Sequence, residues 1–139
     1  EVFKDLNFSD EEIKKGLENF KILGRQQKIK ENILVDVSHN VASIKALIKN
    51  LKDIKNVNIF LSVLQDKDLK TIYRLLKNEG YNISLYPMPD IKRGRTKENI
   101  LETLGNVPIT TNLNPIDHMF NVYCGSFYFI QKVMHHILY

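Results

Sequence analysis

The sequence predicts a three-layer α/β domain, in which helices cover both faces of a mostly parallel β-sheet. The short run without alternation at residues 33–37 is typical of a strand buried on both faces, and residues 120–124 indicate another strong strand. Most of these runs lead into a segment whose apolar residues recur at helical spacing, and glycines and prolines separate the units. Strands that alternate with helices in this way are joined by crossovers, which make the sheet largely parallel.

Capping and turn residues set the limits of the predicted elements. Ser9 and Glu12 form a capping box at the start of the first helix, and Gly80 lies just after a later one. A turn is predicted at residues 24–27. The predicted helices span residues 9–19, 40–51, 68–78, 96–104 and 126–138. The predicted strands span residues 33–37, 57–63, 81–86 and 120–124, with residues 107–111 as a candidate edge strand.

The composition fits one globular domain in a reducing compartment. The chain has 139 residues, of which 43% are hydrophobic and 26% charged, and its net charge of +4 is a mild bias. Cys124 is the only cysteine, which excludes an intrachain disulfide framework. No run approaches about 20 apolar residues, and the charged amino terminus does not resemble a signal peptide. We therefore expect a cytoplasmic protein. Because the chain starts at Glu1 rather than Met, we also expect it to be part of a longer one.

Polar side chains follow three of the predicted strands at the point where each strand ends. In an open parallel sheet, ligands bind outside the carboxyl ends of the strands, where helix amino termini also point unpaired N–H groups. A carboxylate, an imidazole, an ammonium and hydroxyls at one rim suit a ligand with both hydroxyls and carboxylates or phosphates. The residues that this rule selects are Asp36, Ser38, His39, Asn40, Gln65, Asp66, Lys67, Cys124, Gly125 and Ser126.

Each of these residues also has a purely structural interpretation, which the sequence leaves open. Asp36 and Ser126 can cap the helices that follow them, and His39 can be a surface residue of a first helical turn. Lys67 lies between two aspartates and can be an ordinary solvated charge. Cys124 lies in an apolar strand and suits a small buried residue better than a nucleophile.

Other polar groups give weaker signals. Arg93 and Arg95 flank a glycine, so they form either a phosphate clamp or an exposed basic turn. His135 and His136 complement the dipole of the last helix and need no metal. The chain contains no GxxxxGK[ST] phosphate loop, no GxGxxG, no HExxH and no GxSxG. Its charge is too weak and too dispersed to predict nucleic-acid binding.

Four sequence elements occur in one order and in one strand–turn–helix context. They are Gly-Arg-Gln-Gln at 24–27, Asp-Val-Ser-His-Asn at 36–40, Leu-Gln-Asp-Lys-Asp at 64–68 and Val-Tyr-Cys-Gly-Ser-Phe at 122–127. Together they resemble elements of the folylpolyglutamate synthases and dihydrofolate synthases, which belong with the Mur ligases. The chain departs from the family pattern at Leu23 and Val41, where the family has proline, and at Gln26, where it has an aromatic residue.

The resemblance implies a Rossmann-like carboxy-terminal domain of an ATP-dependent ligase that acts in folate biosynthesis and one-carbon metabolism. Residues 23–139 are expected to form this domain, and residues 1–22 the end of a preceding ATP-binding domain. The implied reaction adds L-glutamate to folate or dihydropteroate through an acyl phosphate. The phosphate loop and the Mg²⁺ ligands are expected in the preceding domain, so this chain alone should be inactive. The implied protein is a monomer that binds neither nucleic acid nor membrane.

The resemblance also assigns roles to five residues, and no residue of this chain to a metal. It implies that Arg25 contacts the phosphates of ATP and that Asp36 accepts hydrogen bonds from the ribose. His39 and Lys67 match positions near the transferred phosphate and the incoming glutamate, and they are the implied catalytic residues. Ser126 joins them in binding glutamate. A cation such as Lys67 at a helix start offsets the cost of desolvating the two glutamate carboxylates.

Two alternatives remain open from the sequence. A Mur-type ligase would use the same chemistry on peptidoglycan precursors, although the second and fourth sequence elements are more similar to those of the folate enzymes. A free-standing nucleotide- or amino-acid-binding module would have no catalytic partner. A phosphate loop encoded upstream of Glu1 would support a ligase, whereas an initiator Met directly before Glu1 would favour the module.

Overall fold

Residues 26–139, which the computed structural model describes, form one five-stranded sheet with the strand order β1-β2-β5-β3-β4. β1 is antiparallel to β2, and the other neighbouring strands are parallel. The strands are β1 (Gln27–Lys30), β2 (Ile33–Asp36), β3 (Val57–Ser62), β4 (Asn82–Leu85) and β5 (Phe120–Gly125). The predicted helix at 9–19, the expected tail at 1–22 and Arg25 lie outside the described residues.

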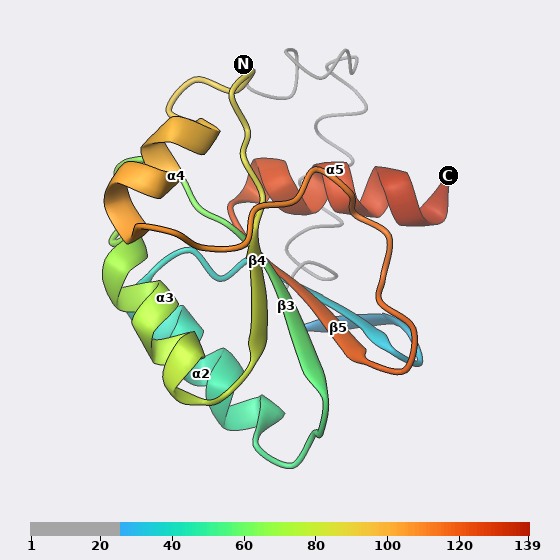
Figure 1. The fold of residues 1–139 in the computed structure, drawn as a ribbon. Coiled ribbons are helices and arrows are strands. Elements are labelled where there is room, and N and C mark those ends of the chain that lie inside the picture. Colours follow the sequence, from blue (N-terminus) through green and yellow to red (C-terminus); the bar gives the residue numbers. More distant parts are fainter. Residues whose placement is uncertain (1–25) are drawn as a thin grey trace.

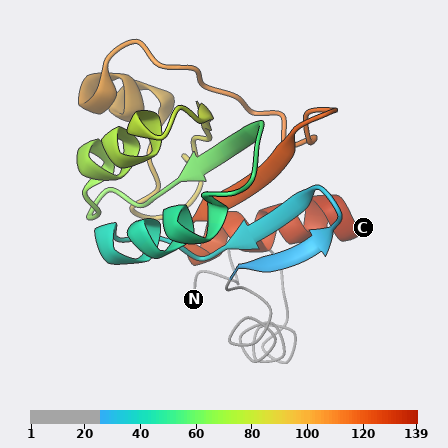
Figure 2. The same ribbon diagram turned by 90° about the horizontal axis from the view of Figure 1, so that it is seen from below.

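Helices cover both faces of this sheet, which confirms the predicted three-layer, Rossmann-like α/β fold. Figure 1 shows α2 (Val41–Leu51), α3 (Leu69–Asn78) and α4 (Lys97–Leu104) along one face, with α5 (Phe127–Leu138) apart from them. The view from below in Figure 2 separates the same two layers. The helices begin within one residue of their predicted starts, and the residue predicted to start each helix is its N-cap: Asn40, Asp68, Thr96 and Ser126.

Two apolar clusters, one on each face, hold the layers together. The first joins α2, α3 and α4 to the sheet, and the second joins α5 to the opposite face. Fully buried helix residues of the first cluster are Ile44, Leu47, Ile72 and Leu76, and those of the second are Phe129, Ile130 and Val133. The ring of Tyr123 in β5 stacks on that of Phe60 in β3, with centroids 4.6 Å apart, so the second cluster also ties these two strands.

One local prediction was wrong, and one agrees with the structure only in part. Gln27, which was predicted to end a turn, instead begins β1, whose residues pair with β2 as Gln27↔Val35 and Lys28↔Leu34. A short edge strand with exposed lysines carries little apolar signal, which is why the sequence pattern missed it. The candidate edge strand at 107–111 makes only one bridge, between Leu85 and Ile109. A proline within this segment cannot donate a ladder hydrogen bond.

Asparagine side chains join the amino-terminal ends of three strands. Asn82 donates to Asn58 at 2.7 Å, and Asn58 donates to Asn121 at 3.0 Å. The Asn121 amide also donates to the carbonyls of Ile116 and Met119, each at 3.0 Å. Asn58 and Asn121 are fully buried. Because each amide satisfies its neighbour, the network fixes the register of β3, β4 and β5 at this end of the sheet.

At the other end of the sheet, β2, β5 and β3 terminate side by side. Cys124 lies opposite both Asp36 and Leu61, and Gly125 lies opposite Ser62. The backbone approach is so close that a Cβ atom on Gly125 would lie 1.9 Å from the Ser62 carbonyl oxygen. Since the three strands are parallel and adjacent, the segments that follow them leave from one edge.

Candidate functional site

The segments that carry the predicted site residues start from this carboxyl edge. Asp36 is the last residue of β2 and His39 follows that strand, Lys67 follows β3, and Ser126 follows β5. The strand order places β5 between β2 and β3, so these starting points are neighbours in space. The rim that the sequence predicted is therefore present among the described residues, and Arg25 lies outside them.

Asp36 ends β2 as a nearly buried carboxylate with 3% exposure. It accepts a hydrogen bond from the Ser38 hydroxyl and another, at 3.1 Å, from the backbone N–H of Gln26. Its interpretation as the cap of α2 is wrong, because the Asn40 side chain accepts from the Ser43 N–H at 2.8 Å instead. A carboxylate has about four acceptor positions, so it can accept hydrogen bonds from several donors at once.

His39 is half-buried and lies directly before Asn40, the cap of α2. It therefore precedes the helix and is not part of its first turn. The unpaired N–H groups at the start of α2 and the His39 ring occupy the same end of that helix. This position suits contact with an anionic group.

Ser126 caps α5, as its structural interpretation predicted. Its Oγ accepts a hydrogen bond from the Phe129 N–H at 3.2 Å, and the side chain is buried with 4% exposure. The Ser126 N–H donates to the Ser62 carbonyl at 2.8 Å, which fixes the residue against the end of β3. A serine hydroxyl that accepts a capping bond still has its own hydrogen to donate, so capping is compatible with a ligand contact.

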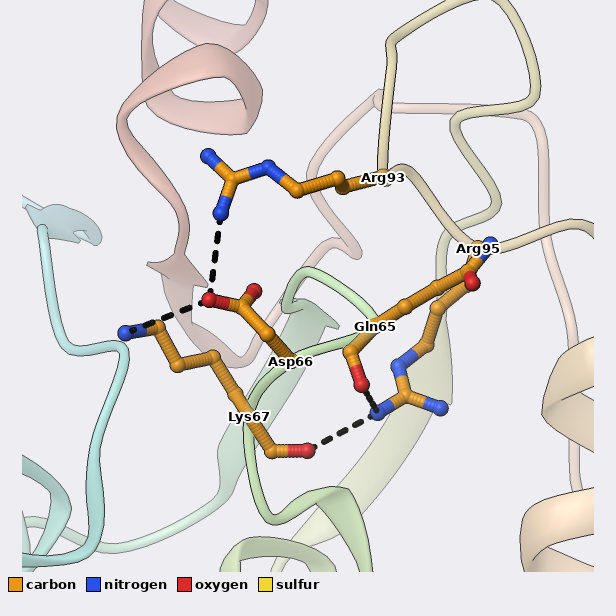
Figure 3. A network of polar contacts seen from close by, with 5 residues as sticks. All are labelled: Gln65, Asp66, Lys67, Arg93 and Arg95. Carbon is orange, nitrogen blue, oxygen red and sulfur yellow. Dashed lines mark hydrogen bonds and ion pairs between the residues drawn. The ribbon is translucent and has the colours of Figure 1, made fainter.

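Lys67 lies in the turn between β3 and α3, shown in Figure 3. Its side chain is 31% exposed, and its Nζ is 4.0 Å from Asp66 Oδ2. The next residue, Asp68, caps α3 by accepting from the Thr71 N–H at 3.2 Å. Hydrogen bonds with Thr71 lower the pKa of Asp68. Lys67 is thus a partly exposed cation at the start of a helix, and within residues 26–139 its ammonium has a distant ion pair with Asp66.

The two arginines of the 93–95 loop have different environments. The Arg93 side chain is 53% exposed and its Nη1 contacts Asp66 Oδ2 at 3.1 Å, so the exposed-turn interpretation holds for Arg93. It is wrong for Arg95, which is only 7% exposed. The Arg95 guanidinium donates to the backbone of the Lys67 turn (Figure 3). Sequence reasoning assigned no role to Arg95, because a basic residue next to glycine gives no signal of burial.

The remaining polar groups of the described chain add no second reactive centre. Burial raises the pKa of the Cys124 thiol far above its usual value, and the Asp36 carboxylate raises it further, which confirms a buried structural cysteine. His136 contacts Asn114 through Nε2 at 2.8 Å. Residues 26–139 contain no group of three or more His, Cys, Asp or Glu side chains suited to a metal ion. In the same residues, no helix has the length and apolar character of a membrane span.

Comparisons with known proteins connect this geometry to one group of enzymes. No protein-family model matches the chain, and no curated protein matches it. Solved structures do match. Escherichia coli FolC in complex with ADP is 26% identical with a TM-score of 0.70, over 83% of this chain and 31% of that one. Helicobacter pylori folylpolyglutamate synthetase is 28% identical with a TM-score of 0.67, over 94% of this chain and 36% of that one.

A third match agrees with these two at the level of the fold. The Yersinia pestis bifunctional folylpolyglutamate synthase/dihydrofolate synthase, complexed with AMPPNP and Mn, has a TM-score of 0.72 and 23% identity. The match covers 95% of this chain and 35% of that one. The chain thus spans about a third of the length of the structures that it matches. The resemblance to this group that the four sequence elements predicted is confirmed.

Proposed function

We propose that this chain is the carboxy-terminal domain of an ATP-dependent ligase that adds glutamate to folate or dihydropteroate. The observation that carries the proposal is the rim itself. Three sequence elements of this chain that resemble those of the folate ligases lie at adjacent strand ends. The fold that brings them together matches the fold of those enzymes. In the proposed protein, residues 23–139 form this domain and residues 1–22 the end of the preceding one.

The ligands of the matched structures support the proposed substrates. Escherichia coli FolC was solved with ADP and, in a second complex, with DHPP and ADP. A bifunctional enzyme of the same group was solved with Mn, AMPPNP and L-glutamate. We therefore propose ATP, L-glutamate and a pterin acid as the substrates of the protein that contains this chain.

The proposed reaction has two steps, and the residues of this chain act by positioning and by charge. The γ-phosphoryl group of ATP passes to the carboxylate of the pterin acid, which gives an acyl phosphate and ADP. The glutamate amine then attacks that carbonyl, and phosphate leaves. In this proposal Arg25 binds ATP phosphates and Asp36 accepts the ribose hydroxyls. Lys67, His39 and Ser126 hold the glutamate and the transferred phosphate.

We assign no residue of this chain to the divalent ion. The described residues contain no suitable acidic cluster, and the proposed Mg²⁺ ligands belong to the preceding domain together with the phosphate loop. When bound there, Mg²⁺ would neutralise charge on the transferred phosphoryl group. Because the proposed phosphate loop and Mg²⁺ ligands lie in the preceding domain, we expect that the 139-residue chain alone does not hydrolyse ATP.

The test is a steady-state assay of the full-length protein with ATP, glutamate and each pterin acceptor in turn. Asp36→Ala should raise KM for ATP, whereas Lys67→Ala should raise KM for glutamate more than KM for ATP. Lys70→Ala on the exposed surface of α3 is the matched control and should change neither value. A peptidoglycan-precursor acceptor serves as the competing substrate. Turnover of that acceptor in place of the pterins, or ATPase activity of the 139-residue chain, would contradict the proposal.

A further inference from the structure

A buried arginine holds the turn that carries Lys67. Arg95 Nη2 donates to the Lys67 carbonyl at 2.9 Å and to the Gln65 carbonyl at 3.4 Å. Its Nη1 donates to Asn99 Oδ1 at 2.9 Å and to Thr103 Oγ1 at 3.4 Å, both on α4. One guanidinium therefore links the 65–67 turn to α4, and it contacts the turn through backbone atoms (Figure 3).

Further bonds join the 93–95 loop to the same turn. The Gln65 side chain donates to the Gly94 carbonyl at 2.9 Å, and the Gln65 N–H donates to the Arg93 carbonyl at 2.8 Å. Arg93 also pairs with Asp66. Each of the three residues in the turn thus has at least one bond to the loop, so the two segments form one rigid unit.

The loop itself is held in a demanding conformation. Arg93 has a positive φ of 66°, which is uncommon for a residue with a side chain. A Cβ atom on Gly94 would lie 2.0 Å from the Met88 carbonyl oxygen, so only glycine fits there. Strained backbone of this kind is retained where the surrounding structure requires one geometry.

Burying the Arg95 guanidinium has a desolvation cost. Desolvation lowers the pKa of its guanidinium, and the Asp66 carboxylate offsets this only in part. Its buried Nε–H has no hydrogen-bond partner among the described residues. A buried charge is weak evidence for a stabilising role, and the bonds of Arg95 to the 65–67 turn favour a positioning role.

We propose that Arg95 is a positioning residue, which fixes the Gln65–Lys67 backbone so that the Lys67 ammonium meets a carboxylate of the incoming amino acid. This inference rests on the proposed role of Lys67 in glutamate binding. The planar guanidinium can reach two carbonyls of the turn and two side chains of α4 at once, and a lysine ammonium at the same position cannot. For holding the turn, the planar shape of the Arg95 guanidinium is thus more important than its charge.

Arg95→Lys in the full-length protein is the direct test, because it keeps the positive charge and removes the planar guanidinium with its several N–H donors. A displaced catalytic group costs up to about 100-fold, so we expect KM for glutamate to rise about 10-fold and KM for ATP to stay within about twofold. The matched control is Arg74→Lys on the exposed surface of α3, which should change neither value. Gln65→Ala removes one bond from an exposed residue and should raise KM for glutamate by a smaller factor. If Arg95→Lys fails to fold, the Gln65→Ala variant still tests whether the bonds between the turn and the loop affect KM for glutamate.

A double-mutant cycle separates positioning from general destabilisation. If Arg95 acts through Lys67, then Arg95→Lys should have no further effect on KM for glutamate in a Lys67→Ala background. Equal increases in both KM values, or independent effects of the two mutations on KM for glutamate, would overturn the inference. An unchanged KM for glutamate in Lys67→Ala alone would instead reject the proposed role of Lys67. A clear effect of Lys67→Ala with none of Arg95→Lys or Gln65→Ala would reject only the role of Arg95.

Discussion

Replacing Gly125 by alanine should damage the junction on which the rim depends. Gly125 lies opposite Ser62 at the end of β5, with a φ of 145° that side chains rarely adopt. An added Cβ would lie 1.9 Å from the Ser62 carbonyl oxygen and 2.7 Å from its carbonyl carbon. Both atoms belong to the backbone of β3, the strand next to β5, so no side-chain rotation can relieve the contact.

The size of the effect follows from three contributions. The new Cβ must retreat by about 1.5 Å, the difference between 1.9 Å and the 3.4 Å at which ordinary contact begins. Overpacking of this kind costs about 1–3 kcal/mol. The strained φ adds about 1–3 kcal/mol. Loss of the hydrogen bond from the Ser126 N–H to the Ser62 carbonyl adds about 1 kcal/mol. We expect the free energy of unfolding to fall by about 5 kcal/mol in total, and Tm by about 17 °C.

Urea and thermal unfolding of the 139-residue chain, followed by circular dichroism, measure this change. Gly80→Ala is the matched control, because Gly80 has a φ of 83° but no atom within 4 Å of the added Cβ. It should lose only the conformational contribution, about 1 kcal/mol. If the two variants have the same stability to within about 1 kcal/mol, the reasoning from the β3–β5 contact is refuted.

Two further predictions concern the core. Asn121→Ala should lower the free energy of unfolding by about 3 kcal/mol, because it leaves the buried Asn58 amide and the Ile116 N–H without their acceptor. Asn82→Ala, at the exposed end of the network, should lower the free energy of unfolding by about 1 kcal/mol or less. Urea titrations of the two variants measure both values, and equal decreases in the free energy of unfolding would contradict this account. The buried Cys124, with its raised pKa, should not react with a thiol reagent such as DTNB in the native protein, and its labelling rate in urea should follow global unfolding. Fast labelling of Cys124 without denaturant would show that the carboxyl end of β5 opens locally without global unfolding.

Local patterns in the chain account for most of the secondary structure. The predicted strands and helices within residues 26–139 agree with the structure to within one or two residues, apart from β1 and the 107–111 segment. Apolar periodicity and caps such as Thr96 act over a few neighbouring residues, so they can be read without the fold. The same holds for the rim. Polar residues that follow parallel strands must share an edge, whichever order the strands adopt.

Contacts between distant segments could not be read in this way. The insertion of β5 between β2 and β3, the pairing of β1 with β2 and the buried asparagine network each depend on residues that are far apart in the chain. Arg95 shows the limit most clearly. Its neighbours in sequence indicate an exposed turn, but folding places it against Gln65 and Lys67, about thirty residues away. A polar side chain can be buried wherever folding supplies enough partners, and only the assembled strands and loops supply them.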